Sequence, residues 1–438
     1  MSEYRERYDK IFSLLKAHHN WFAESLPMVA SENVPSPAVR ETLLSDLGNR
    51  YAEGWPGERV YAGCTYIDQI ELIAIEEAKK LFQCEFVDVR PVSGVCANLA
   101  IYTAFTSAGD YMMCLSIPSG GHISTGKAEL GGTAGSVHGI RTEYFPFDYD
   151  EMNIDIDKTM TKVNELEKAG VNIKLVMFGG SVLLFPHPVK ELASFFKERG
   201  TFICYDAAHV IGLIAGKKFQ EPLREGADVI TCSTHKTLFG PQGGMILSFD
   251  RFSDKIKRAV FPGNVSNHHL HSVAGKAVAL AEALEFGEKY ADQVIRNAKA
   301  LATALYDRGL RVVGERRGFT ESHIVLIDVT KFGLGGDLEK KLERANIICN
   351  RNLLPWDIKE GRHFSNPGGL RFGVSELTRL GMTQSDMEVV ADLISDVIVK
   401  GKDPEIVRDQ VKEFRKSFQT VHFCFEPSRA PHEYIGIK

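Results

Sequence analysis

Alternation between short apolar runs and helix-length amphipathic runs is the feature that most constrains this chain of 438 residues. The alternation begins near residue 68. The apolar runs at 173–178, 202–205, 229–233 and 244–249 are nearly continuous, as is typical of strands that are buried on both faces. We therefore predict an α/β fold with a mainly parallel central sheet, covered by helices on both sides.

The other expected elements have ordinary lengths. Helices are expected at 68–82, 93–106, 189–199 and 337–345, and strands at 86–92, 111–117 and 323–329. A long helix from about 272 to 308, interrupted near Gly287, is expected to bridge two domains.

The predicted division of the chain has three parts. Residues 1–50 form an N-terminal arm, residues 51–285 a large domain, and residues 286–438 a smaller C-terminal α+β domain. The C-terminal domain is expected to contain a Pro/Gly-rich loop at 352–369 and to end in two helices.

Composition narrows the class of protein. With 44% hydrophobic and 25% charged residues the chain is an ordinary globular protein, and a net charge of −5 argues against nucleic acid as the main partner. No apolar stretch approaches the roughly 20 residues of a membrane span, and the polar N-terminus is not a signal peptide. The eight cysteines are scattered without a CxxC pair, which indicates reduced thiols. We expect a soluble cytoplasmic protein.

Three polar groups follow strands that should end at one edge of the sheet, where ligands bind in such folds. Asp206 ends the run at 202–205, with His209 three residues further on, and Lys236 follows the run at 229–233. Ser93-Gly94 follows the run at 86–92 and opens a helix, whose free N–H groups favour a phosphate.

A lysine, a carboxylate and a phosphate cradle are together what pyridoxal phosphate requires. A lone lysine is usually a solvated surface residue, and a lone Ser-Gly is usually a helix cap. The flanks strengthen the functional interpretation, because Ser233 and Thr234 offer hydroxyls and 240–244 forms a glycine-rich turn. We predict a pyridoxal-phosphate enzyme in which Lys236 holds the cofactor.

Five runs carry a resemblance to a known family: 30–33 (ASEN), 50–57 (RYAEGWPG), 219–227 (FQEPLREGA), 233–237 (STHKT) and 350–355 (NRNLLP). The chain resembles the serine hydroxymethyltransferases, pyridoxal-phosphate enzymes of fold type I, and is most similar to the archaeal members. The resemblance covers nearly the whole sequence. It implies reversible transfer of the serine hydroxymethyl carbon to a reduced pterin, tetrahydromethanopterin or tetrahydrofolate, which leaves glycine.

The resemblance also implies roles at the cofactor. Lys236 would form the Schiff base, Asp206 would pair with the pyridine nitrogen, and His209 would lie beside the ring hydroxyl. His122 would stack on the ring, and His235 would lie near the phosphate and help to order the site. Further residues implied to bind the cofactor are Ser93, Gly94, Ser181 and Ser233, with Gly263 and Tyr51 contributed by the other subunit of an obligate homodimer.

On the substrate side, Arg371 would bind the amino-acid carboxylate, for which its planar guanidinium is suited. Ser31 and Tyr61 would complete this pocket, Tyr61 from the partner subunit. Glu53 would handle protons at the serine hydroxyl, although a surface position is the ordinary explanation for a glutamate in such a loop. Asn352 matches a residue that contacts the pterin. The implied catalytic residues are Lys236, Glu53, His235 and Asp206.

The sequence also departs from the family pattern. Gly263 is followed by Asn-Val-Ser-Asn-His-His in place of a glycine-rich run, and Val95 stands where bacterial and eukaryotic members carry a serine. Val60 replaces a tyrosine near the carrier, and Phe239 and Gln242 replace a small residue and an arginine. The carrier could be tetrahydrofolate or tetrahydromethanopterin, and the archaeal resemblance favours the latter.

The sequence alone leaves two other functional hypotheses beside a hydroxymethyltransferase. The same residues would serve a pterin-independent aldolase or transaldolase acting on threonine-like β-hydroxy amino acids. A non-catalytic homologue is a different class, which intact Lys236, Asp206 and Arg371 disfavour. The histidines at 268, 269 and 271 invite a metal site, but no acidic or cysteine partner accompanies them in the sequence, so no metal is expected.

Overall fold

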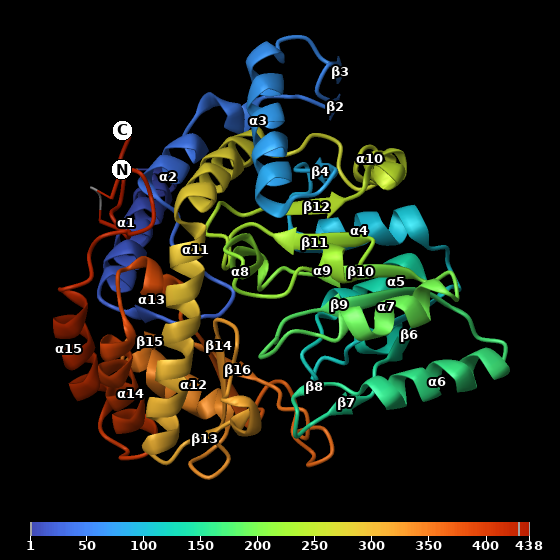
Figure 1. Ribbon diagram of the computed structural model, residues 1–438. Coiled ribbons are helices and arrows are strands. Elements are labelled where there is room, and N and C mark those ends of the chain that lie inside the picture. Colours follow the sequence, from blue (N-terminus) through green and yellow to red (C-terminus); the bar gives the residue numbers. More distant parts are fainter. Residues whose placement is uncertain (1, 428–429, 438) are drawn as a thin grey trace.

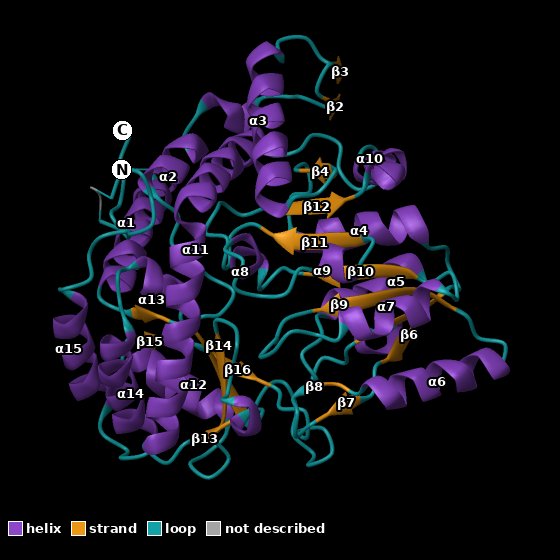
Figure 2. Ribbon diagram, viewed as in Figure 1, coloured by secondary structure: helices purple, strands orange, loops and turns teal. Residues whose placement is uncertain are grey.

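The computed structural model describes residues 2–427 and 430–437 (Figure 1). A seven-stranded sheet and a four-stranded sheet form the two centres of the fold, and Figure 2 shows helices packed around both. No helix in these described residues is long and apolar enough to cross a membrane.

The seven-stranded sheet is mainly parallel, as predicted. Its order is β4 (Phe86–Asp88), β12 (Gly244–Ser248), β11 (Val229–Ser233), β10 (Phe202–Asp206), β9 (Ile173–Gly179), β5 (Tyr111–Cys114) and β6 (Arg141–Tyr144). Only β12 runs against its two neighbours, β11 and β4.

Both faces of this sheet are buried, which explains the continuous apolar runs. In β9, Val176 and Phe178 belong to one hydrophobic core, whereas Leu175 and Met177 belong to a second core. Successive strand residues point to opposite faces, so β9 contributes to both cores, as β10, β11 and β12 also do. The helices α4 (Gly94–Phe105) and α10 (Ser253–Val260) pack against each other beside the second core.

The long helix α11 (Leu270–Asp307) connects the two sheets without interruption, so the predicted break near Gly287 is wrong. Gly216 packs closely against the helix at this point, because a Cβ on Gly216 would lie 2.4 Å from the carbonyl oxygen of Gly287. The helix packs on α3 (Thr65–Phe82) at one end and on α14 (Gln384–Ile398) towards the other.

The four-stranded sheet is antiparallel, with the order β13 (Arg311–Val312), β14 (Ile324–Asp328), β17 (Gly369–Gly373) and β16 (Asn350–Asn352). The helices α12 (Gly335–Arg344), α14 and α15 (Pro404–Arg415) belong to the same part of the chain. An N-terminal helix, α1 (Glu3–Ala23), was not expected. After it, β1 (Leu26–Pro27) pairs with β15 (Ile347–Ile348), so the N-terminal arm packs on C-terminal elements (Figure 1).

The remaining elements are short or lie at the periphery. They are α2 (Pro37–Leu43), β2 (Gly54–Trp55), β3 (Glu58–Arg59), α5 (Thr133–His138), β7 (Phe147–Asp148), β8 (Asn153–Ile154), α6 (Ile156–Lys168), α7 (Val189–Lys197), α8 (Ile211–Ala215), α9 (Pro222–Glu225) and α13 (Ser375–Arg379).

Candidate active site

A cavity of about 150 Å³ lies at the carboxyl ends of the central strands. Its lining residues follow strands β4, β9, β10 and β11, the edge at which ligands bind in a parallel sheet. Nine predicted site residues line it together: Ser93, Gly94, His122, Ser181, Asp206, His209, Ser233, His235 and Lys236.

Lys236 lies three residues beyond the buried end of β11. Burial lowers the pKa of its amine from 10.5 to about 8, and the charge of Arg371 acts in the same direction. Its backbone is held in place by Asn33, whose Nδ2 donates to the Lys236 carbonyl oxygen at 2.8 Å. A buried lysine with a lowered pKa is a suitable nucleophile.

Asp206, at the end of β10, is held at both carboxylate oxygens. Oδ2 accepts a hydrogen bond from Nδ2 of Asn98 at 2.9 Å, and Oδ1 accepts one from the Ala208 N–H at 2.9 Å. Asn98 is fixed in turn by Thr231, whose hydroxyl donates to Oδ1 at 2.6 Å. The sequence analysis missed Asn98, although an isolated asparagine in the apolar run GVCANLA was a usable signal.

The other end of the cavity has the features of an anion site. Ser93 caps α4, accepting from the Cys96 N–H at 3.2 Å, so the first N–H groups of the helix face this end. A Cβ on Gly94 would lie 2.5 Å from Oγ of Ser233, so any larger residue would displace that hydroxyl. Nδ1 of His235 is buried without a hydrogen-bond partner in the described part of the chain. A buried nitrogen without a hydrogen-bond partner fits a site that holds a polar group.

The other two histidines of the cavity are buried and favour the neutral form. Burial lowers the pKa of His122, and Nδ1 of this residue lies 2.8 Å from Oγ of Ser124. Burial lowers the pKa of His209 well below its ordinary value. Its ring stacks on His323, a residue that the sequence analysis missed, at a centroid distance of 5.6 Å.

A second, larger cavity of about 510 Å³ adjoins the first, and both are lined by His122, Ser181, His209 and Lys236. Ser31, Asn352 and Arg371 also line it, so three predicted substrate residues lie together.

Arg371 links the two sheets across this cavity. From β17 its Nη1 donates to the Ser181 carbonyl oxygen at 2.8 Å, and its Nε donates to Oδ1 of Asn350 at 3.1 Å. Burial lowers its pKa to about 10, so the guanidinium remains charged near neutral pH. Among residues 2–427 and 430–437, no group accepts from Nη2, which leaves that nitrogen for a ligand.

Four predicted site residues lie outside both cavities: Tyr51, Glu53, Tyr61 and Gly263. The rings of Tyr51 and Tyr61 contact each other at 5.2 Å, and the two residues are 54% and 46% exposed. The structure therefore does not bring these four residues to Lys236 of their own chain.

Two predictions about the departures from the family pattern need correction. Phe239 is buried against Tyr290, with ring centroids 5.0 Å apart, so this difference concerns the core and not the carrier. His268 does have an acidic partner, because Nε2 lies 2.8 Å from Oε2 of Glu71 in α3. The described residues contain no group of three or more His, Cys, Asp or Glu that could hold a metal ion.

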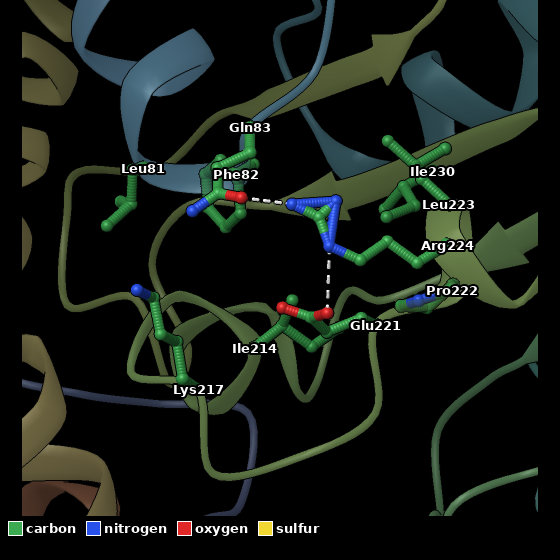
Figure 3. A pocket seen from close by; sticks show the side chains of 10 residues that line it. All are labelled: Leu81, Phe82, Gln83, Ile214, Lys217, Glu221, Pro222, Leu223, Arg224 and Ile230. Atoms are coloured by element: carbon green, nitrogen blue, oxygen red, sulfur yellow. Dashed lines mark hydrogen bonds and ion pairs between the residues drawn. The ribbon is translucent and has the colours of Figure 1, made fainter.

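The run 219–227 lies away from both cavities. Part of it lines a small pocket with the end of α3 (Figure 3), where Arg224 is bound by Glu221 at 2.9 Å and by Gln83. Oε1 of Gln220 accepts a hydrogen bond from the hydroxyl of Tyr205, a residue of β10, at 2.7 Å. These contacts join the run to β10 and to the end of α3.

The chain is similar over nearly its whole length to known proteins. The family model described as serine hydroxymethyltransferase matches residues 5–394. The chain belongs to the serine hydroxymethyltransferase family. It is 57% identical to the serine hydroxymethyltransferase of Nitrosopumilus maritimus over 100% of this chain and 99% of that protein. It is 58% identical to that of Cenarchaeum symbiosum (99% and 98% covered) and 51% identical to that of Methanopyrus kandleri (98% and 98% covered).

Membership in the family confirms the predicted fold class and activity. The chain is a fold-type I enzyme that interconverts serine and glycine, and the family uses pyridoxal phosphate with a reduced pterin as co-substrate. The residues of the smaller cavity fit this cofactor, because they combine a nucleophilic lysine, a held carboxylate, a helix N-terminus and an orphaned histidine nitrogen.

Proposed function

We propose that Lys236, Asp206 and Arg371 carry the serine hydroxymethyltransferase reaction in this chain, with a reduced pterin bound in the larger cavity. The proposal rests on one observation. Lys236 lines both cavities, Asp206 only the smaller and Arg371 only the larger, so a cofactor in one cavity would meet an amino acid in the other.

The residues of the smaller cavity have separate tasks in this proposal. Pyridoxal phosphate, when bound, supplies an electron sink for cleavage of the serine Cα–Cβ bond. Lys236 binds it covalently through Nζ, and the lowered pKa provides neutral amine near pH 8. Asp206 keeps a proton on the ring nitrogen, and Asn98 orients that carboxylate. His122 covers the ring face, and Ser93, Gly94, Ser181 and Ser233 hold the remainder.

Arg371 binds the substrate carboxylate with the nitrogen that its contacts to Ser181 and Asn350 leave available. Ser31 closes the same pocket beside Lys236. Asn352 extends this wall towards the reduced pterin. The amino acid is thereby oriented with its Cα towards the smaller cavity.

Glu53, Tyr51, Tyr61 and Gly263 serve the active site of the partner subunit in our proposal. Glu53 moves the proton of the serine hydroxyl, a task that requires hydrogen-bond reach to that oxygen. Because these residues lie outside the cavities of their own chain, a homodimer is needed to supply them.

The homodimer is further supported by helix α1, which has no buried residue in the isolated chain. Its large apolar side chains are exposed, from 41% to 77%, at five positions: Tyr4, Tyr8, Ile11, Leu14 and Leu15. An apolar surface of this kind on a protein of ordinary composition indicates a protein interface. A second copy of the chain would cover it.

For the carrier we propose tetrahydromethanopterin. Val60, which stands in place of a tyrosine next to Tyr61, is 65% exposed on the segment assigned to the partner site. Gln242, in place of an arginine, is also exposed. We further propose a cytoplasmic location, in line with eight unpaired cysteines, and the domain division at residues 50 and 285.

The experiment is a serine-to-glycine assay on the purified protein with tetrahydromethanopterin, with tetrahydrofolate and without pterin. We expect the highest kcat/KM with tetrahydromethanopterin. Val60→Tyr, a substitution at an exposed position, is the matched variant and should raise the relative rate with tetrahydrofolate. Rates that do not respond to either pterin would contradict the proposal and indicate an aldolase.

Lys236→Ala provides the test of the central residue. We expect loss of the visible absorbance of bound cofactor and serine cleavage near background. Normal turnover with unchanged absorbance would show that Lys236 does not hold the cofactor, whatever the outcome of the carrier assay.

A further inference from the structure

The segment that departs most from the family pattern, 264–269, is bonded to the segment that carries Glu53. Ser266 donates from its hydroxyl to Oε1 of Glu53. Asn267 accepts from the Ala52 N–H at 2.9 Å and donates to the Arg50 carbonyl oxygen at 2.8 Å. These contacts hold the backbone just before Glu53 and the side chain of Glu53 itself.

The next residue, His268, connects the same loop to a buried glutamate. It is 2% exposed, and Nε2 lies 2.8 Å from Oε2 of Glu71, which is 0% exposed. The same oxygen binds Nη2 of Arg59 at 2.7 Å. Arg59 belongs to the segment 50–61 and donates from Nη1 to the carbonyl oxygens of Ala52 and Gly54, at 2.7 and 2.8 Å.

Other contacts hold the C-terminal half of the segment 50–61. The Gly57 N–H and Nε of Arg59 donate to Asp68 at 2.9 and 2.8 Å, and the ring of Trp55 stacks on Phe86. The pairing of β2 with β3 joins two residues to two residues, and such a short ribbon is marginal by itself. Tyr51 and Tyr61 at either end are about half exposed. Ser266 and Asn267 add the contacts at Glu53 and at the residues before it, and His268 adds the contact with Glu71. These three side chains are here named the 266–268 clasp.

We propose that the 266–268 clasp positions Glu53 for proton transfer at the serine hydroxyl. This inference rests on the proposed role of Glu53. Ser266 occupies Oε1 and leaves Oε2 for the substrate, whereas Asn267 fixes the backbone on the N-terminal side of the glutamate. A carboxylate that transfers a proton must be held within hydrogen-bond reach, because small displacements lower the rate sharply. The clasp residues are positioning residues and do not touch the substrate.

The inference also explains the departure from a glycine-rich run. Glycines would bring the backbone close to a phosphate but would offer no side chain to Glu53. Polar side chains at 266, 267 and 268 have the opposite effect, since each is used in a contact with the segment 50–61 or with Glu71 beneath it.

The first test compares Ser266→Ala with Ser266→Thr in the cofactor-loaded enzyme. Loss of a hydrogen bond to a charged group should lower kcat for serine cleavage roughly ten- to a hundredfold. KM for serine should change little, because Arg371 is untouched. The threonine variant should retain the wild-type kcat, because its hydroxyl can still donate to Glu53. Wild-type kcat in both variants would overturn the inference.

The second test measures hydrogen exchange and does not depend on activity. Asn267→Ala should accelerate amide exchange across residues 50–61 while leaving α4 unchanged. The matched control is Asn264→Ala, whose amide in the same loop donates to the Ala259 carbonyl oxygen at 2.8 Å and does not contact the segment 50–61. Equal exchange in the two variants would contradict the role of the clasp.

Glu53→Gln separates this inference from the function on which it rests. Full activity of Glu53→Gln would overturn the proposed role of Glu53 and the inference with it. An inactive Glu53→Gln, together with wild-type behaviour of Ser266→Ala and Asn267→Ala, would overturn the inference alone. Support requires that Ser266→Ala has no further effect on kcat in the Glu53→Gln background.

Discussion

Nδ2 of Asn98 donates to Oδ2 of Asp206 across 2.9 Å, and this bond connects helix α4 to the end of strand β10. Both the nitrogen and the oxygen of the Asn98 amide are held by the protein. Nδ2 also donates to Oγ of Ser124 at 3.0 Å, and Oδ1 accepts from the Thr231 hydroxyl at 2.6 Å. The residue that caps α4, Ser93, lines the same cavity at the end that we propose for the cofactor phosphate. One helix thus serves both ends of the cofactor site.

The first prediction concerns this bond. Asn98→Ala should weaken cofactor binding about tenfold, because a hydrogen bond to a charged group contributes about 1.5–3 kcal/mol and part of that loss is offset by water. The measurement is a titration of the apoprotein by visible absorbance. Thr103→Ala, on the same helix but exposed and outside the cavity, serves as the control. Equal affinity in the two variants would contradict the assigned role of Asn98.

The second prediction follows from the pKa of Lys236, which burial lowers from 10.5 to about 8. Only the neutral amine attacks a carbonyl group, and a lowered pKa increases its fraction at any pH below 10.5. The rate at which the apoprotein captures pyridoxal phosphate should therefore rise between pH 7 and 8 and level off above about 8. Stopped-flow absorbance measures this rate. A rise that continues to pH 10 would indicate a lysine with an ordinary pKa.

The central sheet was predictable from sequence because burial on both faces leaves a continuous apolar run, as in β9 and β11. The reversed direction of β12 was not, since periodicity carries no information about strand direction. Helix α1 was missed because none of its residues is buried in the single chain. The break expected at Gly287 was wrong because local propensity does not reveal a packing partner such as Gly216.

In the candidate site too, local patterns were predictable from the sequence and long-range contacts were not. Lys236, Asp206 and Ser93 were predictable because each follows a recognisable strand, and strand ends converge in a parallel sheet. Contacts between distant segments were not predictable. Ser266 and Glu53 are 213 residues apart in sequence, and the acidic partner of His268 lies in α3 and not beside it.

The third prediction concerns Lys276, which is 3% exposed behind the glycine turn at 243–244. Nζ donates to the carbonyl oxygens of Val89, Pro91 and Gly244, at 2.6, 3.2 and 2.9 Å. Lys276→Met should destabilise the protein by about 1–3 kcal/mol or more, because three carbonyls lose their donor. It should also weaken cofactor binding, since these carbonyls flank Ser93.

Thermal unfolding and cofactor titration measure both effects of Lys276→Met. Lys289→Met, at an exposed position of the same helix, is the matched control and should behave as wild type. An unchanged melting temperature for Lys276→Met would contradict the assigned contacts.

The last prediction concerns Glu376, a buried glutamate remote from Lys236. Burial, and secondarily the nearby Glu32, raise its pKa from 4.5 to about 8, while Arg415 acts in the opposite direction. Burial lowers the pKa of His432 to about 3, and its Nε2 lies 3.4 Å from Oε1 of Glu376. Near neutral pH both groups are therefore uncharged.

The folded chain thus binds this proton more tightly than the unfolded chain does. The resulting stabilisation is fully present below about pH 4.5 and is lost as the pH rises through about 8. Glu376→Gln keeps a neutral donor at every pH, so its melting temperature should exceed that of the wild type by several degrees at pH 9 and match it near pH 5. Glu413→Gln, whose side chain is 74% exposed, should follow the wild type throughout. If Glu376→Gln and the wild type lose stability in parallel between pH 6 and 9, Glu376 is not the group that titrates.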